Sequence, residues 1–264
     1  MIKKKLNISD IKNKKFKNPL IVLTAYTAPL AEILDKYCDI ILVGDSVGMV
    51  LHGMKNTSNV TLDMMIMHAK AVKSRVKNTI VVVDMPINTY ENNQSKALSN
   101  AKKIMRETNC DAVKVEGGLK IYKTVEMLVK NKIPVMGHIG LLPQSVKKES
   151  DYRAKGRDLE NYNNIIRDAI ALQEAGVFSV VIECVIKELA DKINRIINIP
   201  TIGIGASDTC DGQVLVTADI LGITKKVPKF VKVYDQLNTR IENNIKKYVR
   251  DLKLKKFPSK NNYY

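Results

Sequence analysis

The sequence predicts an α/β protein in which 264 residues form a single (β/α)8 TIM barrel. Three observations carry this prediction. The length suits one large α/β unit, because closed barrels often have about 250 residues. Short apolar runs rich in β-branched residues alternate with longer amphipathic stretches, which is the order of parallel strands joined by helices. No Gly-x-Gly-x-x-Gly follows the first run, and this disfavours an open dinucleotide-binding sheet.

Eight apolar runs are the candidates for the barrel strands. Most are nearly continuous, as expected of parallel strands that are buried on both faces. Eight runs in one chain favour a closed barrel, because an open doubly wound sheet usually needs fewer strands. The runs cover Leu20–Tyr26, Ile40–Ser46, Thr79–Pro86, Ala112–Gly118, Pro134–Leu141, Ser179–Val185, Pro200–Ala206 and Asp219–Thr224.

The stretches between these runs predict amphipathic helices. In Gln94–Thr108, for example, Ala97, Leu98, Ala101 and Ile104 recur at the spacing of one helix face. No Pro- or Ser-rich linker interrupts the pattern, so we expect one domain over residues 1–264 with basic arms at both ends. The other predicted helices cover Val60–Val76, Ile121–Lys130, Tyr162–Ala175, Ile186–Ile197 and Val233–Leu254.

The formal net charge of +16 taken alone suggests a nucleic-acid partner. Many of the lysines lie in the terminal arms, however, and no aromatic residues are interleaved with them as stacking platforms. The abundance of Lys, Ile and Asn is also what AT-rich codons produce without selection for a basic surface. We therefore expect no nucleic-acid partner.

Other features of composition indicate a cytoplasmic protein. No apolar run reaches the roughly 18–20 residues of a membrane span, and the basic start of the chain has no following apolar stretch, unlike a secretory signal. We expect no membrane partner. Four scattered cysteines are typical of reduced thiols: Cys38, Cys110, Cys184 and Cys210.

Three acids stand near the carboxyl ends of consecutive predicted strands: Asp45, Asp84 and Glu116. A barrel presents these ends on one face, so the acids should converge there. A single Asp in such a place more often caps a helix, but three like charges together need a cation. Oxygen ligands suit Mg²⁺, whereas zinc is disfavoured because the three histidines show no paired spacing.

Glu183 lies within an apolar run, which predicts a desolvated carboxylate. Burial raises the pKa of a carboxyl group, and a raised pKa is what a general base near neutral pH requires. The alternative is a structural ion pair with a barrel Lys or Arg.

Lys114 lies two residues before Glu116, so strand alternation places both side chains in the barrel interior. Lys114 could form a Schiff base with a carbonyl substrate, or it could remain an ammonium that pairs with a carboxylate or enolate oxygen. The acid cluster favours the second role, because a metal would polarise the carbonyl instead. His138, at the end of the fifth run, could hydrogen-bond the substrate or brace the barrel mouth.

Eight sequence blocks occur in order along the chain. Because of these blocks, the chain resembles the ketopantoate hydroxymethyltransferase family over nearly its whole length. They are VGDSVGM at Val43–Met49, VDMP at Val83–Pro86, VKVEGG at Val113–Gly118, GHIGLLPQS at Gly137–Ser145, IECV at Ile182–Val185, IGIGA at Ile202–Ala206, DGQVLV at Asp211–Val216 and PKF at Pro228–Phe230.

The resemblance implies a reaction and an assembly. The family transfers a hydroxymethyl unit from 5,10-methylenetetrahydrofolate to 3-methyl-2-oxobutanoate, giving 2-dehydropantoate in pantothenate biosynthesis. It forms large homo-oligomers, usually decamers. By match, Asp45 and Asp84 would bind Mg²⁺, Glu116 would complete the metal site and Glu183 would accept a proton. The side chains that would contact the keto acid by match are Asp45, Ser46, Asp84 and Lys114.

The chemistry of these residue types agrees with that reaction. Mg²⁺ chelated by a 2-oxo acid acidifies the neighbouring C–H, Glu183 removes the proton, and Lys114 helps the metal to stabilise the enolate that attacks the folate methylene. The alternatives are another Mg²⁺-dependent enolate former, such as a 2-oxo acid C–C lyase, a Schiff-base aldolase, or a non-catalytic nucleic-acid-binding barrel. The chain departs from the family pattern at Thr27, where Asp is usual, and in the loop at residues 151–157.

Overall fold

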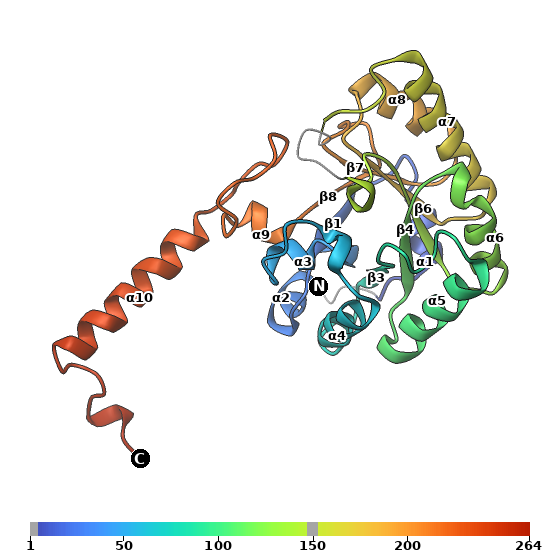
Figure 1. The fold of residues 1–264 in the computed structure, drawn as a ribbon. Helices are drawn as coiled ribbons and strands as arrows, with labels where there is room; N and C mark the ends of the chain where they lie inside the picture. The colour runs from blue at the N-terminus through green and yellow to red at the C-terminus, as the bar shows by residue number, and fades with distance from the viewer. Residues whose placement is uncertain (1–4, 147–152) are drawn as a thin grey trace. The chain divides into compact units, whose positions relative to one another are not determined.

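A computed structural model describes residues 5–146 and 153–264. The chain divides into two compact units, one ending at Leu215 and one that runs from Val216 to Tyr264. The first unit contains the barrel and the second contains the last helices (Figure 1). That both units belong to one domain stays a prediction.

The first unit is a closed barrel of eight parallel strands, which confirms the predicted fold class. Each strand pairs with the next along the chain, and β8 pairs with β1 to close the barrel. The strands are β1 Leu20–Thr24, β2 Ile40–Val43, β3 Ile80–Asp84, β4 Ala112–Glu116, β5 Val135–Gly140, β6 Ser179–Glu183, β7 Thr201–Ile204 and β8 Gly212–Leu215.

The predicted position of the eighth strand is wrong. We expected it at Asp219–Thr224, but β8 ends at Leu215 and Thr217–Ile220 forms a short helix, α9. Within β8 the side chain of Gln213 is exposed, so these four residues show no continuous apolar run. Gly212 is required there by packing, because a Cβ would lie 2.5 Å from the backbone oxygen of Leu20.

Helices surround the strands of the first unit (Figure 1). Four of them begin with a side chain that accepts a hydrogen bond from a backbone N–H of the first turn: Asn7, Thr61, Asn93 and Asp158. The predicted helices of this unit are confirmed to within a few residues. The helices are α1 Ile8–Lys12, α2 Ala28–Leu34, α3 Val47–Val50, α4 Leu62–Lys73, α5 Gln94–Thr108, α6 Tyr122–Lys130, α7 Leu159–Glu174 and α8 Lys187–Ile196, with short 3₁₀ turns η1 Thr57–Asn59, η2 Leu119–Ile121 and η3 Pro143–Ser145.

The barrel interior is filled by side chains, so the barrel is not a pore. Inward residues of the strands, among them Leu20, Ile40 and Ile80, form a buried cluster with Ile11 of α1. Ile11 is completely buried, so part of the basic N-terminal segment is folded against the amino end of the barrel. A second cluster fills the space between the strands and the surrounding helices.

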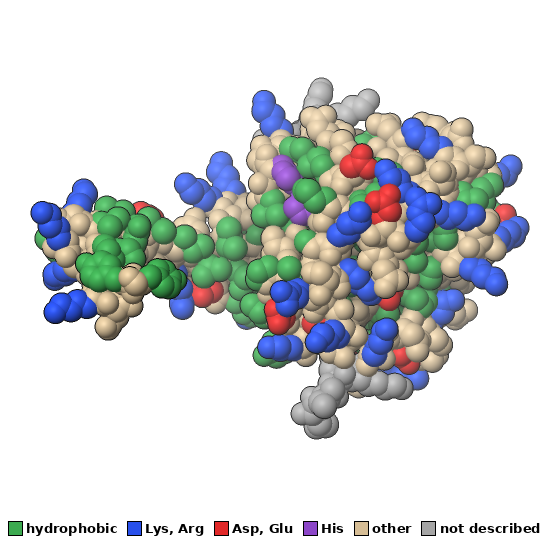
Figure 2. Space-filling view, turned by 90° about the horizontal axis from the view of Figure 1, so that it is seen from below, with side chains coloured by type: hydrophobic (Ala, Val, Ile, Leu, Met, Phe, Trp, Pro, Cys, Tyr) green, Lys and Arg blue, Asp and Glu red, His purple; other side chains and the backbone are tan. Residues whose placement is uncertain are grey.

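The second unit contains α9, α10 at Leu237–Lys253 and a 3₁₀ turn at Lys260–Asn262. No residue of α10 is buried, although it is strongly amphipathic. Figure 2 shows hydrophobic surface beside many Lys and Arg side chains. None of the helices in the described ranges has the length and apolar character to cross a bilayer. The apolar face of α10 consists of Ile241, Ile245, Tyr248, Val249 and Leu252, each more than two fifths exposed.

Candidate active site

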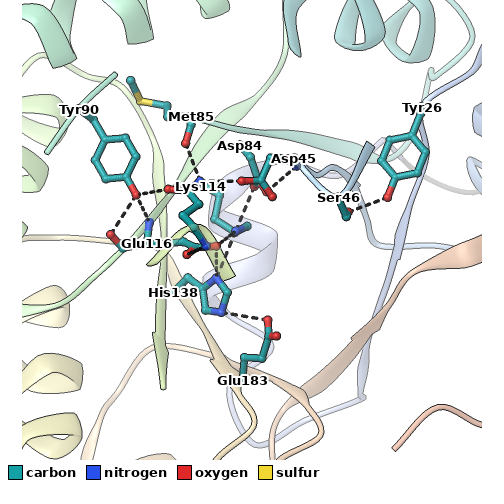
Figure 3. A network of polar contacts seen from close by, with 11 residues as sticks. Tyr26, Asp45, Ser46, Asp84, Met85, Tyr90, Lys114, Glu116, His138 and Glu183 are labelled. Carbon is teal, nitrogen blue, oxygen red and sulfur yellow. Dashed lines mark hydrogen bonds and ion pairs between the residues drawn. The ribbon is translucent and has the colours of Figure 1, made fainter. Parts of the chain in front are cut away.

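The inner face of the barrel changes from apolar to charged toward the carboxyl ends of the strands. In β3, Ile80 and Val82 belong to the inner cluster, and two-residue alternation carries Asp84 onto the same face. The prediction that Lys114 and Glu116 share the interior face is confirmed, since both are buried there (Figure 3). By the same alternation, β4, β5 and β6 contribute Lys114, Glu116, His138 and Glu183.

Asp45 and Asp84 form a close pair of buried carboxylates. Asp45 follows β2, and its backbone N–H donates to Oδ2 of Asp84 over 3.1 Å. Burial and the carboxylates of Asp84 and Glu116 raise the pKa of Asp45 to about 8, and burial raises the pKa of Asp84 as well. The pair therefore carries more negative charge than its surroundings stabilise, and it favours a bound proton or cation.

Lys114 stands between the acids. Its Nζ lies 3.2 Å from Oδ1 of Asp84 and 4.0 Å from Oε1 of Glu116. Although burial favours the neutral amine, the carboxylates of Asp84, Glu116 and Asp45 raise the pKa of Lys114 above its usual value. The side chain is therefore an ammonium, which favours its role as a charge partner over that of a Schiff-base nucleophile.

His138 connects Glu116 with Glu183 (Figure 3). Its Nδ1 lies 3.4 Å from Oε1 of Glu116, and its Nε2 lies 3.2 Å from Oε2 of Glu183. Burial and Lys114 act against its charged form, but the two carboxylates outweigh them and raise the pKa of His138 to about 9. Burial also opposes ionisation of Glu116, yet His138 and Lys114 lower the pKa of Glu116.

Glu183 is less enclosed than the other acids, with 14% of its side chain exposed against 3% for Glu116. Its ion-pair partner is His138 and not the Lys or Arg that the alternative interpretation required. Glu183 therefore has a charged neighbour, and a role separate from the Asp45–Asp84 pair stays a prediction.

Ser46 has a partner that the sequence did not indicate. Its Oγ lies 2.7 Å from the hydroxyl of Tyr26, which follows β1. Burial raises the pKa of Tyr26 to about 12, so the phenol is neutral at physiological pH. The Tyr26 carbonyl lies 2.9 Å from Nδ1 of His68, whose Nε2 in turn contacts His52.

Two further polar residues lie among the acids and were missed: Tyr90, after β3, and Gln144, in η3. Both are buried and hydrogen-bonded within the cluster. Each lies in an irregular segment, where neither periodicity nor strand position marks an inward side chain. The only available signal for Gln144 is its place inside the GHIGLLPQS block.

The three acids do not form one ligand set, because Lys114 separates Glu116 from Asp84. Among the described residues there is no group of three or more His, Cys, Asp and Glu side chains that could hold a metal ion. The Asp45–Asp84 pair alone still suits a hard divalent cation, because it offers carboxylate oxygens. Oδ1 of Asp84 has the Lys114 ammonium 3.2 Å away but accepts no hydrogen bond.

Solved structures with low sequence identity support the barrel fold alone. A 2,3-dimethylmalate lyase, described as a member of the PEP mutase/isocitrate lyase superfamily, aligns with a TM-score of 0.64 and 13% identity over 92% of this chain and 87% of its own. A phosphonopyruvate hydrolase solved with oxalate and Mg²⁺ aligns with a TM-score of 0.59 and 11% identity over 94% and 88%.

Sequence relatives are far more similar. A protein of Bartonella quintana (strain Toulouse) is 48% identical over 99% of this chain and 95% of its own length. One of Pelagibacter ubique (strain HTCC1062) is 49% identical over the full length of both. Each is named 3-methyl-2-oxobutanoate hydroxymethyltransferase. The model of the family described as ketopantoate hydroxymethyltransferase matches residues 5–260. The chain therefore belongs to the ketopantoate hydroxymethyltransferase family.

Proposed function

We propose that this chain transfers a hydroxymethyl unit from 5,10-methylenetetrahydrofolate to 3-methyl-2-oxobutanoate, forming 2-dehydropantoate and tetrahydrofolate for pantothenate biosynthesis. The relatives' name supports the acceptor and the transferred group, and the folate donor follows from the family resemblance. The observation that supports the proposal is the division of the acids at the strand ends into a buried pair that favours a cation, Asp45 and Asp84, and a more exposed carboxylate beside His138, Glu183.

Asp45 and Asp84 would hold Mg²⁺ directly. Both oxygens of Glu116 already have partners, in His138 and in the backbone N–H of Gln144, so Glu116 would take part through a water molecule. A bound Mg²⁺ would supply Lewis acidity toward the carboxylate and keto oxygens of a 2-oxo acid.

Individual side chains would then have separate roles in the reaction. Glu183 removes the proton from C3 of the keto acid, and the C–H electron pair forms the enolate. The Lys114 ammonium stabilises the negative charge that develops on the keto oxygen. C3 forms a bond to the methylene carbon of the folate, and one water supplies the hydroxyl oxygen. In the net reaction both C–N bonds of that carbon break with their electron pairs left on N5 and N10, which receive the proton taken from C3 and one proton of the water. His138, a cation near neutral pH, orients Glu183, and Ser46, held by Tyr26, binds the substrate carboxylate.

The α10 face supports the further proposal of a homo-oligomer, which the resemblance extends to a decamer. A helix with five exposed apolar residues on one face leaves that face in water unless another surface covers it. Light scattering of the purified protein tests this, because a monomeric mass at micromolar concentration contradicts it. A cytoplasmic site of action stays a prediction from the sequence.

The reaction is tested by incubating the protein with 3-methyl-2-oxobutanoate and 5,10-methylenetetrahydrofolate and detecting 2-dehydropantoate by mass spectrometry. We expect product with Mg²⁺, none after treatment with EDTA, and no borohydride trapping of Lys114. Cleavage of a 2-oxo acid without any need for folate would support the lyase alternative instead.

A further inference from the structure

Gln144 connects four parts of the candidate active site through its own hydrogen bonds. Its Nε2 donates to Oδ2 of Asp45 over 2.8 Å and to the carbonyl of Met85 over 3.0 Å. Its Oε1 accepts from the hydroxyl of Tyr90 over 2.7 Å, and its backbone N–H donates to Oε2 of Glu116 over 3.1 Å. These partners follow or belong to β2, β3 and β4, and Figure 3 shows them around one point.

Only an amide can make this set of contacts. Both hydrogens of Nε2 are donated, and the oxygen accepts one bond, so every polar atom of the side chain is used. A carboxylate could not donate to Asp45 or to the Met85 carbonyl. Gln144 is only 4% exposed, so bulk water has little access with which to replace a missing donor.

Tyr90 fixes which end of the amide faces Asp45. The Tyr90 hydroxyl accepts the backbone N–H of Glu116 over 3.0 Å. Its single hydrogen is then free to be donated, and the shortest acceptor contact is Oε1 of Gln144. An amide turned the other way would direct its NH₂ group at this donor and its oxygen at two acceptors, the Asp45 carboxylate and the Met85 carbonyl, so the oxygen stays on Tyr90 and the nitrogen stays on Asp45.

We infer that Gln144 is a positioning residue that orients the Asp45 carboxylate toward the cation. By binding Oδ2 it leaves Oδ1 of Asp45 as the oxygen presented to a ligand, and its backbone N–H holds Glu116 at the same time. The inference rests on the proposed role of Asp45 as a magnesium ligand. Groups that hydrogen-bond a ligating carboxylate typically contribute about 10–100-fold to metal affinity or activity.

The test measures Mn²⁺ binding to the metal-free, full-length protein in the absence of substrates. Binding is monitored through the electron paramagnetic resonance signal of the free Mn²⁺. Gln144→Met keeps the length of the side chain and removes both donors. We expect its Kd for Mn²⁺ to rise about 10–100-fold. Ser145→Ala is the matched control, because Ser145 is the exposed neighbour in the same turn, and its Kd should equal that of the unaltered protein.

A second readout separates positioning from general damage. If Gln144 acts through the cation, raising the Mg²⁺ concentration should restore most of the lost turnover in Gln144→Met. Tyr90→Phe removes the hydroxyl that fixes the amide. It should also raise the Kd for Mn²⁺, but by a smaller factor than Gln144→Met. This variant decides the question if Gln144→Met does not fold.

The outcomes distinguish two failures. If the unaltered protein does not bind Mn²⁺, the proposed metal site fails and the inference fails with it. If the unaltered protein binds Mn²⁺ and the Gln144 and Tyr90 variants bind it equally well, the inference is overturned while the proposed function stands.

Discussion

The two ends of the barrel both contain buried acids, but the Asp45–Asp84 pair at the carboxyl end is less well satisfied than Asp211 at the amino end. At the amino end, Asp211 accepts hydrogen bonds from Lys15, from the backbone N–H of Phe16 and from Thr201. At the carboxyl end, Asp45 receives one side-chain donor, from Gln144, and Oδ1 of Asp84 has the Lys114 ammonium 3.2 Å away as its charged partner. The amino end therefore stabilises the fold, and the carboxyl end is prepared for a ligand.

The pKa values of Asp35, near the amino end, and Asp45, at the carboxyl end, shift in opposite directions. Burial acts to raise the pKa of Asp35 near the amino end, but hydrogen bonds from Asn78, Lys77 and Thr79 outweigh it and lower that pKa. Burial raises the pKa of Asp45 to about 8, and the neighbouring carboxylates add to the effect. Two carboxylates with little solvent exposure can thus serve opposite purposes, depending on how deeply they lie in the protein and on how many donors face them.

The largest effect is expected at the carboxyl end. Glu183→Gln removes the proposed base while keeping its size, and we expect kcat to fall about 10³-fold. The free energy of unfolding should change little, because this end does not stabilise the fold. Steady-state formation of 2-dehydropantoate measures the loss. Glu188→Gln, the same change on an exposed residue of α8, serves as the control, and equal turnover in both variants would contradict the assignment.

At the amino end the expected effect is on stability. Asp211→Ala leaves Lys15, the backbone N–H of Phe16 and Thr201 without their acceptor, and we expect a loss of about 3 kcal/mol in the free energy of unfolding. Urea unfolding measures it. Asp63→Ala removes an exposed ion pair with Lys103 and should cost much less stability than Asp211→Ala. A raised KM for the keto acid in Asp211→Ala would contradict the separation of the two ends.

Cation addition should stabilise the protein through the carboxyl end alone. At a Mg²⁺ concentration roughly 100 times its Kd, we expect the free energy of unfolding to rise by about 2.7 kcal/mol. Thermal unfolding with Mg²⁺ and with EDTA measures the increment. It should disappear in Asp84→Asn and persist in Asp211→Ala, and an increment that survives Asp84→Asn would place the cation elsewhere.

The smallest effect concerns pH at the amino end. The folded-state pKa of Asp35 lies below its unfolded value of 3.8, so its contribution is present above about pH 4 and is lost as the pH falls through the folded pKa. Asp35→Asn should lose less stability below pH 4 than the unaltered protein in urea titrations. Asp45→Asn is the control of opposite sign: the folded pKa of Asp45 is about 8, above its unfolded value of 3.8, so Asp45 destabilises the folded state less as the pH falls, and removing it should not reduce the acid loss of stability. A steeper loss of stability at acid pH in Asp35→Asn than in the unaltered protein would contradict a lowered pKa for Asp35.

Much of the fold could be predicted because buried parallel strands produce apolar runs. Seven of the eight strands lie within their predicted ranges. The eighth was misplaced because β8 has four residues, begins with Gly212 and exposes Gln213, while Ile220, Leu221 and Ile223 form a more apolar run outside the barrel.

The charged residues of the site could be predicted for the same reason, since strand alternation determines which side chains point inward. Two features of the site could not be predicted from the sequence. Lys114 separates Glu116 from Asp84, which depends on side-chain conformations within the cluster. Tyr90 and Gln144 reach it from irregular segments, whose course depends on packing between residues far apart in the sequence.

The pairing of β8 with β1 also has a consequence for how the chain folds during synthesis. The Lys15–Asp211 ion pair that accompanies this closure joins residues 196 positions apart. Until the ribosome has released residues near Leu215, β1 and β7 are the two edges of an open sheet, with backbone groups free to pair with another chain. A chain that ends before β8 is therefore expected to aggregate and not to fold as a smaller barrel.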